Sequence, residues 1–153
     1  MKTFLIVDAS DPAMLLNAAV YGADGLIFDL EQAAPGERDA ARLLLGEALA
    51  ALPYRGAEIL VRVDACDGGE TEAELGAIAS LGPDAFVVFE DEGRLVRRAS
   101  PEGGVWGGGE VVARAAPGAA AMDAVGIARA AMNAGFPAFA THDAGLVEAI
   151  GGI

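Results

Sequence analysis

The chain has 153 residues, of which 54% are hydrophobic and 22% charged, so it is long enough and apolar enough to fold as one domain with a substantial core. Its formal net charge of -13 excludes the basic surface that nucleic acid or an anionic membrane would need in a partner. A single cysteine, Cys66, excludes an internal disulfide and a cysteine-based zinc site.

The N-terminal segment and the apolar runs indicate where the protein acts. Only four apolar residues precede Asp8 after Met1-Lys2-Thr3, which is too short for the core of a signal peptide. No apolar run reaches the roughly 18 residues that a membrane span requires. We therefore expect a cytoplasmic protein without a membrane span.

The first part of the chain alternates between short apolar runs and helical patterns. Ser10-Asp11-Pro12 supplies a helix cap, and Gly22 supplies a stop. Strands are expected at 4–7, 25–30, 58–63 and 85–89, and helices at 13–21, 37–52 and 71–81. This alternation with short joints predicts a parallel sheet with helices packed on it.

After Gly93 the pattern is less regular. The stretch PEGGVWGGG at 101–109 is rich in glycine, so we expect 93–121 to be an irregular segment of a single β/α domain, 1–153, with a further strand near 105–112 at most. Regular patterns return with a helix at 122–133, a strand at 136–140 and a short helix at 144–150.

Charged side chains follow the expected strands where each strand ends. They are Asp8, then Asp29 and Glu31, then Arg62 and Asp64, then Glu90, Asp91 and Glu92. The carboxyl ends of parallel strands meet at one edge, so these residues would share one mouth. Carboxylates bind Mg²⁺, and a guanidinium binds a carboxylate in a bidentate manner. The pattern predicts a Mg²⁺ and carboxylate-substrate site in which Asp29, Glu31 and Arg62 are the best candidates.

A simpler interpretation holds for several of these acids. Asp residues after strands are often helix caps, and an acidic chain places acids at strand ends without any function. This explanation is favoured for Asp8, Asp64 and Asp91 taken singly. It is about as good as the functional one for Asp29 and Glu31.

Three sequence blocks resemble the citrate lyase beta-subunit-like (HpcH/HpaI aldolase) family. They are GADGLIFDLE at 22–31, PGERDAAR at 35–42 and VRVD at 61–64. The resemblance implies a TIM-type β/α barrel, shortened here, that cleaves or forms carbon-carbon bonds in oxo-acid or acyl-CoA substrates with Mg²⁺. It implies that Arg62 grips the substrate carboxylate, and that Asp29 and Glu31 form the acidic exit of the second strand.

The same resemblance implies a ligand set and an assembly. The family places its metal ligands in a later block, for which Glu110 is the stand-in here, so Glu31 and Glu110 are the implied metal ligands. A deletion in the middle of the barrel would account for the length of the chain. An incomplete ring of strands would leave exposed edges, which predicts a homo-oligomer.

Two alternatives remain open at this point. The first is a catalytically inactive relative that serves as a binding or assembly subunit, which is favoured by Phe89-Glu90-Asp91-Glu92 at the exit of the fourth strand and by the altered metal block. The second is an open flavodoxin-like parallel sheet that binds a small ligand. Pairing of the first strand with the last would exclude the second alternative.

Overall fold

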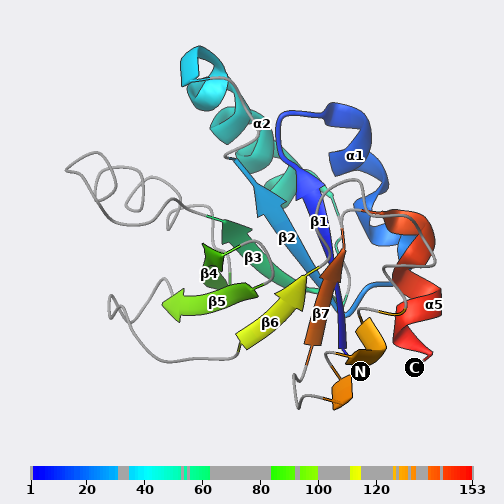
Figure 1. The fold of residues 1–153 in the computed structure, drawn as a ribbon. Helices are drawn as coiled ribbons and strands as arrows, with labels where there is room; N and C mark the ends of the chain where they lie inside the picture. Colours follow the sequence, from blue (N-terminus) through cyan, green and yellow to red (C-terminus); the bar gives the residue numbers. More distant parts are fainter. Residues whose placement is uncertain are drawn as a thin grey trace.

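The computed structural model describes residues 2–30, 35–52, 54, 56–62, 84–91, 94–99, 111–114, 126, 128–130, 132–133, 138–141 and 143–152. Their strands form a closed barrel whose order follows the sequence (Figure 1). The strands are β1 (Lys2–Asp8), β2 (Gly25–Asp29), β3 (Glu58–Arg62), β4 (Ala85–Asp91), β5 (Arg94–Ala99), β6 (Val111–Arg114) and β7 (Ala138–Thr141).

Closure of the barrel decides between the expected architectures. β1 pairs in parallel with β7 on one side and with β2 on the other, and the parallel pairing continues through β3 to β4. The shortened β/α barrel predicted from the sequence is therefore confirmed. The open flavodoxin-like alternative is wrong, because an open sheet leaves its first and last strands unpaired with each other.

The ring is completed by a strand that runs in the opposite direction. β5 pairs antiparallel with both β4 and β6, and only residues 92 and 93 separate β4 from β5. Such a short connection can join antiparallel strands, whereas a parallel pair needs a long crossover. Each described barrel strand thus has two neighbours, so the argument that exposed strand edges require a homo-oligomer does not hold.

Two sequence expectations change in this region. Glu90 and Asp91 belong to β4, and Asp91 pairs with Arg94, so the expectation that these acids lie in a loop after the strand is wrong. β5 falls within 93–121, for which the sequence predicts irregular structure, whereas β6 overlaps the end of the further strand expected near 105–112. The rest of that segment lies outside the described residues.

Helices cover the outside of the barrel. The first expected helix is α1 (Pro12–Asn17), continued by the 3-10 turn η1 (Ala18–Tyr21). Asp11 caps it by accepting from the amides of Ala13 (3.0 Å) and Met14 (3.4 Å), and Gly22, at φ 71°, ends it. The others are η2 (Pro35–Glu37), α2 (Arg38–Ala51), η3 (Ala144–Leu146) and α5 (Val147–Gly151).

Of two further expected helices, one can be compared in part with the structure. The helix expected at 71–81 lies outside the described residues, and within the one expected at 122–133 residues 126, 128–130 and 132–133 are helical. No helix in the described ranges is long and apolar enough to cross a membrane.

Side-chain alternation divides the core into two layers. On β1 and β2, one set of alternate residues packs against α1 and α2 in a buried cluster that includes Leu5, Val7, Leu26, Phe28, Leu15 and Leu45. The other set faces the interior of the barrel and includes Phe4, Ile6 and Ile27, each at most 2% exposed. The barrel interior is therefore filled by side chains, as in other small barrels.

Phe4 needs a glycine beside it. Phe4 and Gly25 are partners in the β1–β2 register, and a Cβ on Gly25 would lie 2.2 Å from the Phe4 ring. We expect Gly25→Ala to lower the free energy of unfolding by about 1–3 kcal/mol, because the buried ring has to move. Gly36→Ala is the matched control, since its Cβ would meet nothing within 4 Å. Urea denaturation measures both, and equal stabilities would contradict this packing.

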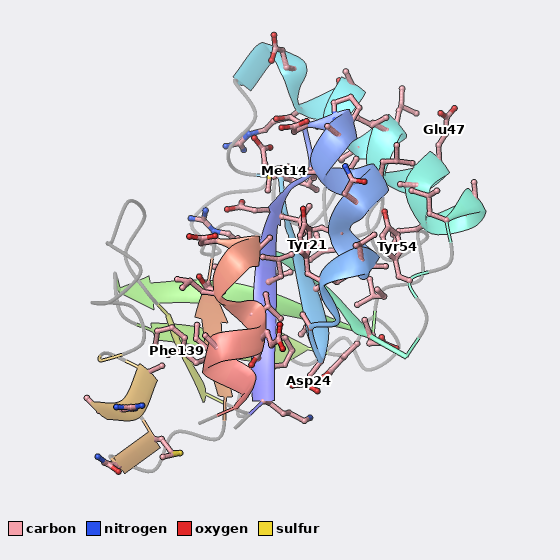
Figure 2. The ribbon with its side chains drawn as sticks, turned by 90° about the vertical axis from the view of Figure 1, so that its right-hand side faces the viewer. Met14, Tyr21, Asp24, Glu47, Tyr54 and Phe139 are labelled. Carbon is pink, nitrogen blue, oxygen red and sulfur yellow. The ribbon has the colours of Figure 1, made fainter. Side chains whose placement is uncertain are left out.

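Tyr54 joins α1 and β2 on the helix side of the barrel (Figure 2). Its hydroxyl donates to the Leu15 carbonyl oxygen of α1 at 2.8 Å, and its ring meets Phe28 of β2 edge to face, with centroids 5.2 Å apart. Burial raises the pKa of the Tyr54 hydroxyl. The neutral phenol is therefore the form that the folded chain stabilises.

Removal of the Tyr54 hydroxyl should lower the free energy of unfolding by an amount that depends on pH. At neutral pH we expect Tyr54→Phe to lose about 1 kcal/mol through the missing hydrogen bond. Because the unfolded chain releases this proton at lower pH than the folded chain does, the wild type should lose its advantage as the pH rises above about 10. Denaturation at pH 7 and pH 11 tests this, with the partly exposed Tyr21→Phe as control. An advantage that grows with pH would contradict it.

Candidate functional site

Three charged residues end three neighbouring strands. Asp8 of β1 is in register with Asp29 of β2, and Asp29 is in register with Arg62 of β3. Paired residues of a parallel ladder point to the same side, and these three continue the alternation of Phe4, Ile6 and Ile27. They therefore face the interior at the carboxyl end of the barrel. We call this set the barrel mouth.

The centre of the barrel mouth is an ion pair. Arg62 Nη1 lies 3.0 Å from Asp29 Oδ2, so the guanidinium donates a charge-assisted hydrogen bond to the carboxylate. Asp29 is 1% exposed, whereas the Arg62 side chain is 23% exposed. The buried carboxylate thus fixes the orientation of a guanidinium that solvent and a ligand can still reach.

Asp8 has a structural role that the sequence left open. Its Oδ1 accepts hydrogen bonds from the Ser10 amide at 2.9 Å and from the Ser10 hydroxyl at 2.6 Å. These bonds form the turn that leads from β1 into α1. The Ala9 amide, in the same turn, donates to the Asp29 carbonyl oxygen at 3.1 Å. The turn therefore holds the end of β1 against the end of β2, beside Asp29.

The structure does not describe the other predicted site residues. Glu31, Glu110 and Asp64 lie outside the described residues. Within the described ranges no group of three or more His, Cys, Asp or Glu side chains could hold a metal ion. The described carboxylates therefore do not fit a Mg²⁺ site by themselves, because Asp29 is engaged by Arg62. Metal binding by Glu31 and Glu110 stays a prediction.

Two aspartates that support the site were not identified from the sequence. Asp24 Oδ2 accepts from the Thr3 amide at 2.8 Å, and Asp84 Oδ2 accepts from the Ile59 amide at 2.7 Å. Each aspartate directly precedes a strand and ties it to the start of its neighbour, which helps to set the register that aligns the barrel mouth. The repeated pattern GADGLIF at 22–28 and GPDAFVV at 82–88 was the available signal.

Comparisons with known proteins find a matching family model, curated relatives and a solved structure. The family model for HpcH/HpaI aldolase/citrate lyase matches residues 2–89. Citrate lyase subunit beta of Leuconostoc mesenteroides subsp. cremoris is 35% identical over 86 residues, which is 56% of this chain and 28% of that protein. The Haemophilus influenzae protein of the same name is 38% identical over 84 residues, or 54% and 29%. The chain thus matches less than a third of the length of these relatives.

The fold has a solved counterpart. The crystal structure of protein CitE from Mycobacterium tuberculosis, in complex with magnesium and acetate, superposes with a TM-score of 0.70 at 14% sequence identity. The superposition covers 97% of this chain and 88% of that one. At this identity the likeness supports the fold alone.

The Asp29 carboxylate is more deeply buried than the Arg62 guanidinium, and this difference leads to a prediction. Arg62→Ala should cost about 2–3 kcal/mol of stability, because it takes the guanidinium away from a carboxylate that is 1% exposed. Asp29→Asn should cost less, because the amide keeps an acceptor and Arg62 is partly exposed.

The surface pair Arg42 and Asp39 is the control for this comparison, since Asp39 is 87% exposed. We expect Asp39→Asn to leave the unfolding midpoint in urea almost unchanged. If Arg62→Ala were no more destabilising than Asp39→Asn, the Asp29–Arg62 pair would not be an ordered feature of the folded chain.

Proposed function

The chain belongs to the HpcH/HpaI aldolase/citrate lyase family, and from this membership we propose that it is a carbon-carbon lyase that acts on an oxo-acid or acyl-CoA substrate. The observation that carries the proposal is the Asp29–Arg62 pair at 3.0 Å in the barrel mouth. In β/α barrels the active site lies at this end of the strands. The family relationship supports lyase chemistry in general, and the substrate class is our proposal.

Arg62 is the residue that we assign to substrate binding. A guanidinium carries five N–H donors in a fixed fork, more than one carboxylate uses. Arg62 can therefore be held by Asp29 and also bind a carboxylate group of the substrate. Asp29 acts as a positioning residue, because it reaches the substrate only through Arg62.

The proposed reaction separates a carbon-carbon bond next to a carbonyl group. The hydroxyl group on C3 loses its proton and becomes a carbonyl group as the C2–C3 bond breaks. The electron pair of the broken bond forms an enolate, which takes up a proton at C2. A positive charge near the carbonyl oxygen stabilises such an enolate. Arg62 supplies a fixed positive charge at this end of the barrel.

Mg²⁺ enters the proposal only through residues outside the described ranges. We propose Glu31 and Glu110 as its ligands, with the magnesium-containing structure of CitE in support. When bound, Mg²⁺ would act as a Lewis acid for the substrate oxygen. We also propose that copies of the same chain associate with one another, and that the protein acts in the cytoplasm.

A second function has support from one observation. The described carboxylates of the barrel mouth are engaged by Arg62 and Ser10, and no metal-holding cluster is found among the described residues. This arrangement is what a binding or assembly subunit without catalysis would retain. Such a relative would still bind a small carboxylate through Arg62, but it would neither need a metal nor form products.

Calorimetry with oxaloacetate, with and without Mg²⁺ and acetyl-CoA, tests the proposal. For a lyase we expect metal-dependent binding, at least about tenfold weaker in Arg62→Ala and intact in Arg42→Ala. Chromatography of the same mixtures should show a new acyl-CoA species. Binding that is independent of metal, with no new species, would establish the non-catalytic alternative. No binding that depends on Arg62 would contradict both functions.

A further inference from the structure

Arg114 is the last residue of β6, and its register places it on the same face of the barrel wall as Phe4. It is in register with Ala140 of β7, and Ala140 is in register with Phe4 of β1. Register partners in a parallel ladder lie on the same side of the sheet. Phe4 is on the interior side and is 2% exposed. Arg114 therefore occupies a position on the interior side of the wall.

The pairing on the other side of β6 gives the same result. Val87 of β4 is on the interior side, because it is in register with the last residue of β3. Val87 pairs with Arg97 of β5, so Leu95, two residues away, is on the same face. Leu95 pairs with Val112 of β6. Arg114 follows Val112 by two residues, so alternation again places it on the interior side.

The tilt of the strands decides the height of each residue in the barrel. Because the strands are tilted against the barrel axis, a line of register partners follows a spiral around the wall. One such line starts at Asp8 on β1 and passes through β2, β3 and β4 to Arg97 on β5. Val96, next to Arg97, pairs with Val111. The line therefore meets β6 one step before Val111.

A second line of register partners gives the size of the stagger. It runs in the other direction, from Phe4 through Ala140 to Arg114. On β1 it starts four residues below Asp8, yet on β6 it ends four residues above the first line. One circuit of the seven strands thus shifts the register by eight residues, which is about one residue per strand.

This stagger brings Arg62 and Arg114 to the same height. β3 and β6 are each two strands away from β1, in opposite directions around the ring (Figure 1). Arg62 is therefore about two residues lower than Asp8, and Arg114 is about two residues higher than Phe4. Both positions are level with Ile6. The two arginines thus occupy opposite walls of the barrel at one height.

Two arginines in this arrangement suit a ligand with two anionic groups. Ile6 is buried in the barrel interior at their height, and the long side chain of an arginine at this height can serve a ligand just above Ile6. The interior of a small barrel is only wide enough for side chains to fill, so one small molecule would be within reach of both walls. The Asp29 carboxylate balances one of the two positive charges.

We propose that Arg114 is a second anion-binding residue of the barrel mouth, and that it selects ligands that carry two anionic groups. Arg62 binds one of these groups, as in the proposed function on which this inference rests, and Arg114 binds the other. Arg114 lies beyond residue 89, where the family match ends. A ligand with a neutral second group binds less well, because it gives up the charge-assisted hydrogen bonds to Arg114.

Calorimetry with matched ligands tests the selectivity of Arg114. Malonate, succinate and glutarate differ in the spacing of their carboxylates, and the monoamide of each replaces one carboxylate by a neutral group of the same shape. We expect the best dicarboxylate to bind the wild type at least about tenfold more tightly than its monoamide. Arg114→Ala should bind the two within about threefold of each other. Arg129→Ala, which removes an exposed arginine, is the matched control and should keep the preference.

Arg114→Lys separates a role in binding from a role in folding. It keeps the positive charge, so it should retain at least about a threefold preference for the dicarboxylate. Urea denaturation shows whether both variants of Arg114 are folded. If Arg114→Ala weakened the dicarboxylate and the monoamide equally, Arg114 would have a structural role and its proposed selectivity would be wrong.

The variants also distinguish failure of this inference from failure of the proposed function. If Arg62→Ala weakens both kinds of ligand while Arg114→Ala keeps the wild-type preference, the function of Arg62 stands and the role of Arg114 is overturned. If Arg62→Ala leaves the affinities unchanged, the proposed function itself is contradicted. A wild type that prefers none of the three dicarboxylates, or binds none of them, would overturn the role of Arg114.

Discussion

The register between β1, β2 and β3 is the constraint on which the rest of the structure depends. It brings Asp29 beside Arg62 on the inner side of the barrel, and Phe28 beside Val61 on the helix side. A slip of one residue would exchange the two faces, burying charges against α2 and exposing Phe28 to the interior. Because a buried carboxylate is tolerated only with a partner, the ion pair and the register support each other. The site is thus part of what specifies the fold.

The two halves of the chain contribute differently to the barrel. The family match ends at residue 89, within β4, and this half contains Asp8, Asp29 and Arg62. The second half closes the ring with the antiparallel strand β5 and a return through β6 to β7. A barrel interior filled by Phe4 and Ile6 needs a complete wall to keep water out, and this short antiparallel route supplies it. The first half of the chain therefore carries the barrel mouth, and the second half completes the wall around it.

Local sequence patterns predicted those features of the fold that depend on residues close together in the chain. The apolar run at 4–7, Asp11 as a cap and Gly22 as a stop all predicted elements that the structure contains, and the common edge of parallel strands predicted that Asp29 and Arg62 meet. β5 was missed because Arg94, Arg97 and Arg98 interrupt the apolar pattern of a strand, and because its pairing with β4 depends on the tertiary structure. The bond from Thr3 to Asp24 spans 21 residues, so the pattern shared by 22–28 and 82–88 marks the aspartate but does not identify its partner, which depends on tertiary pairing.

The proposed function requires the Asp29–Arg62 pair to present a guanidinium to a carboxylate ligand at the barrel mouth. A crystal structure of the protein with oxalate and Mg²⁺ tests this most directly, since oxalate resembles the enolate form of an oxo-acid. We expect an oxalate oxygen within hydrogen-bond distance of the Arg62 guanidinium, with Asp29 still bound to the same arginine. Oxalate bound away from Arg62, or an Arg62 side chain turned out of the barrel, would contradict it.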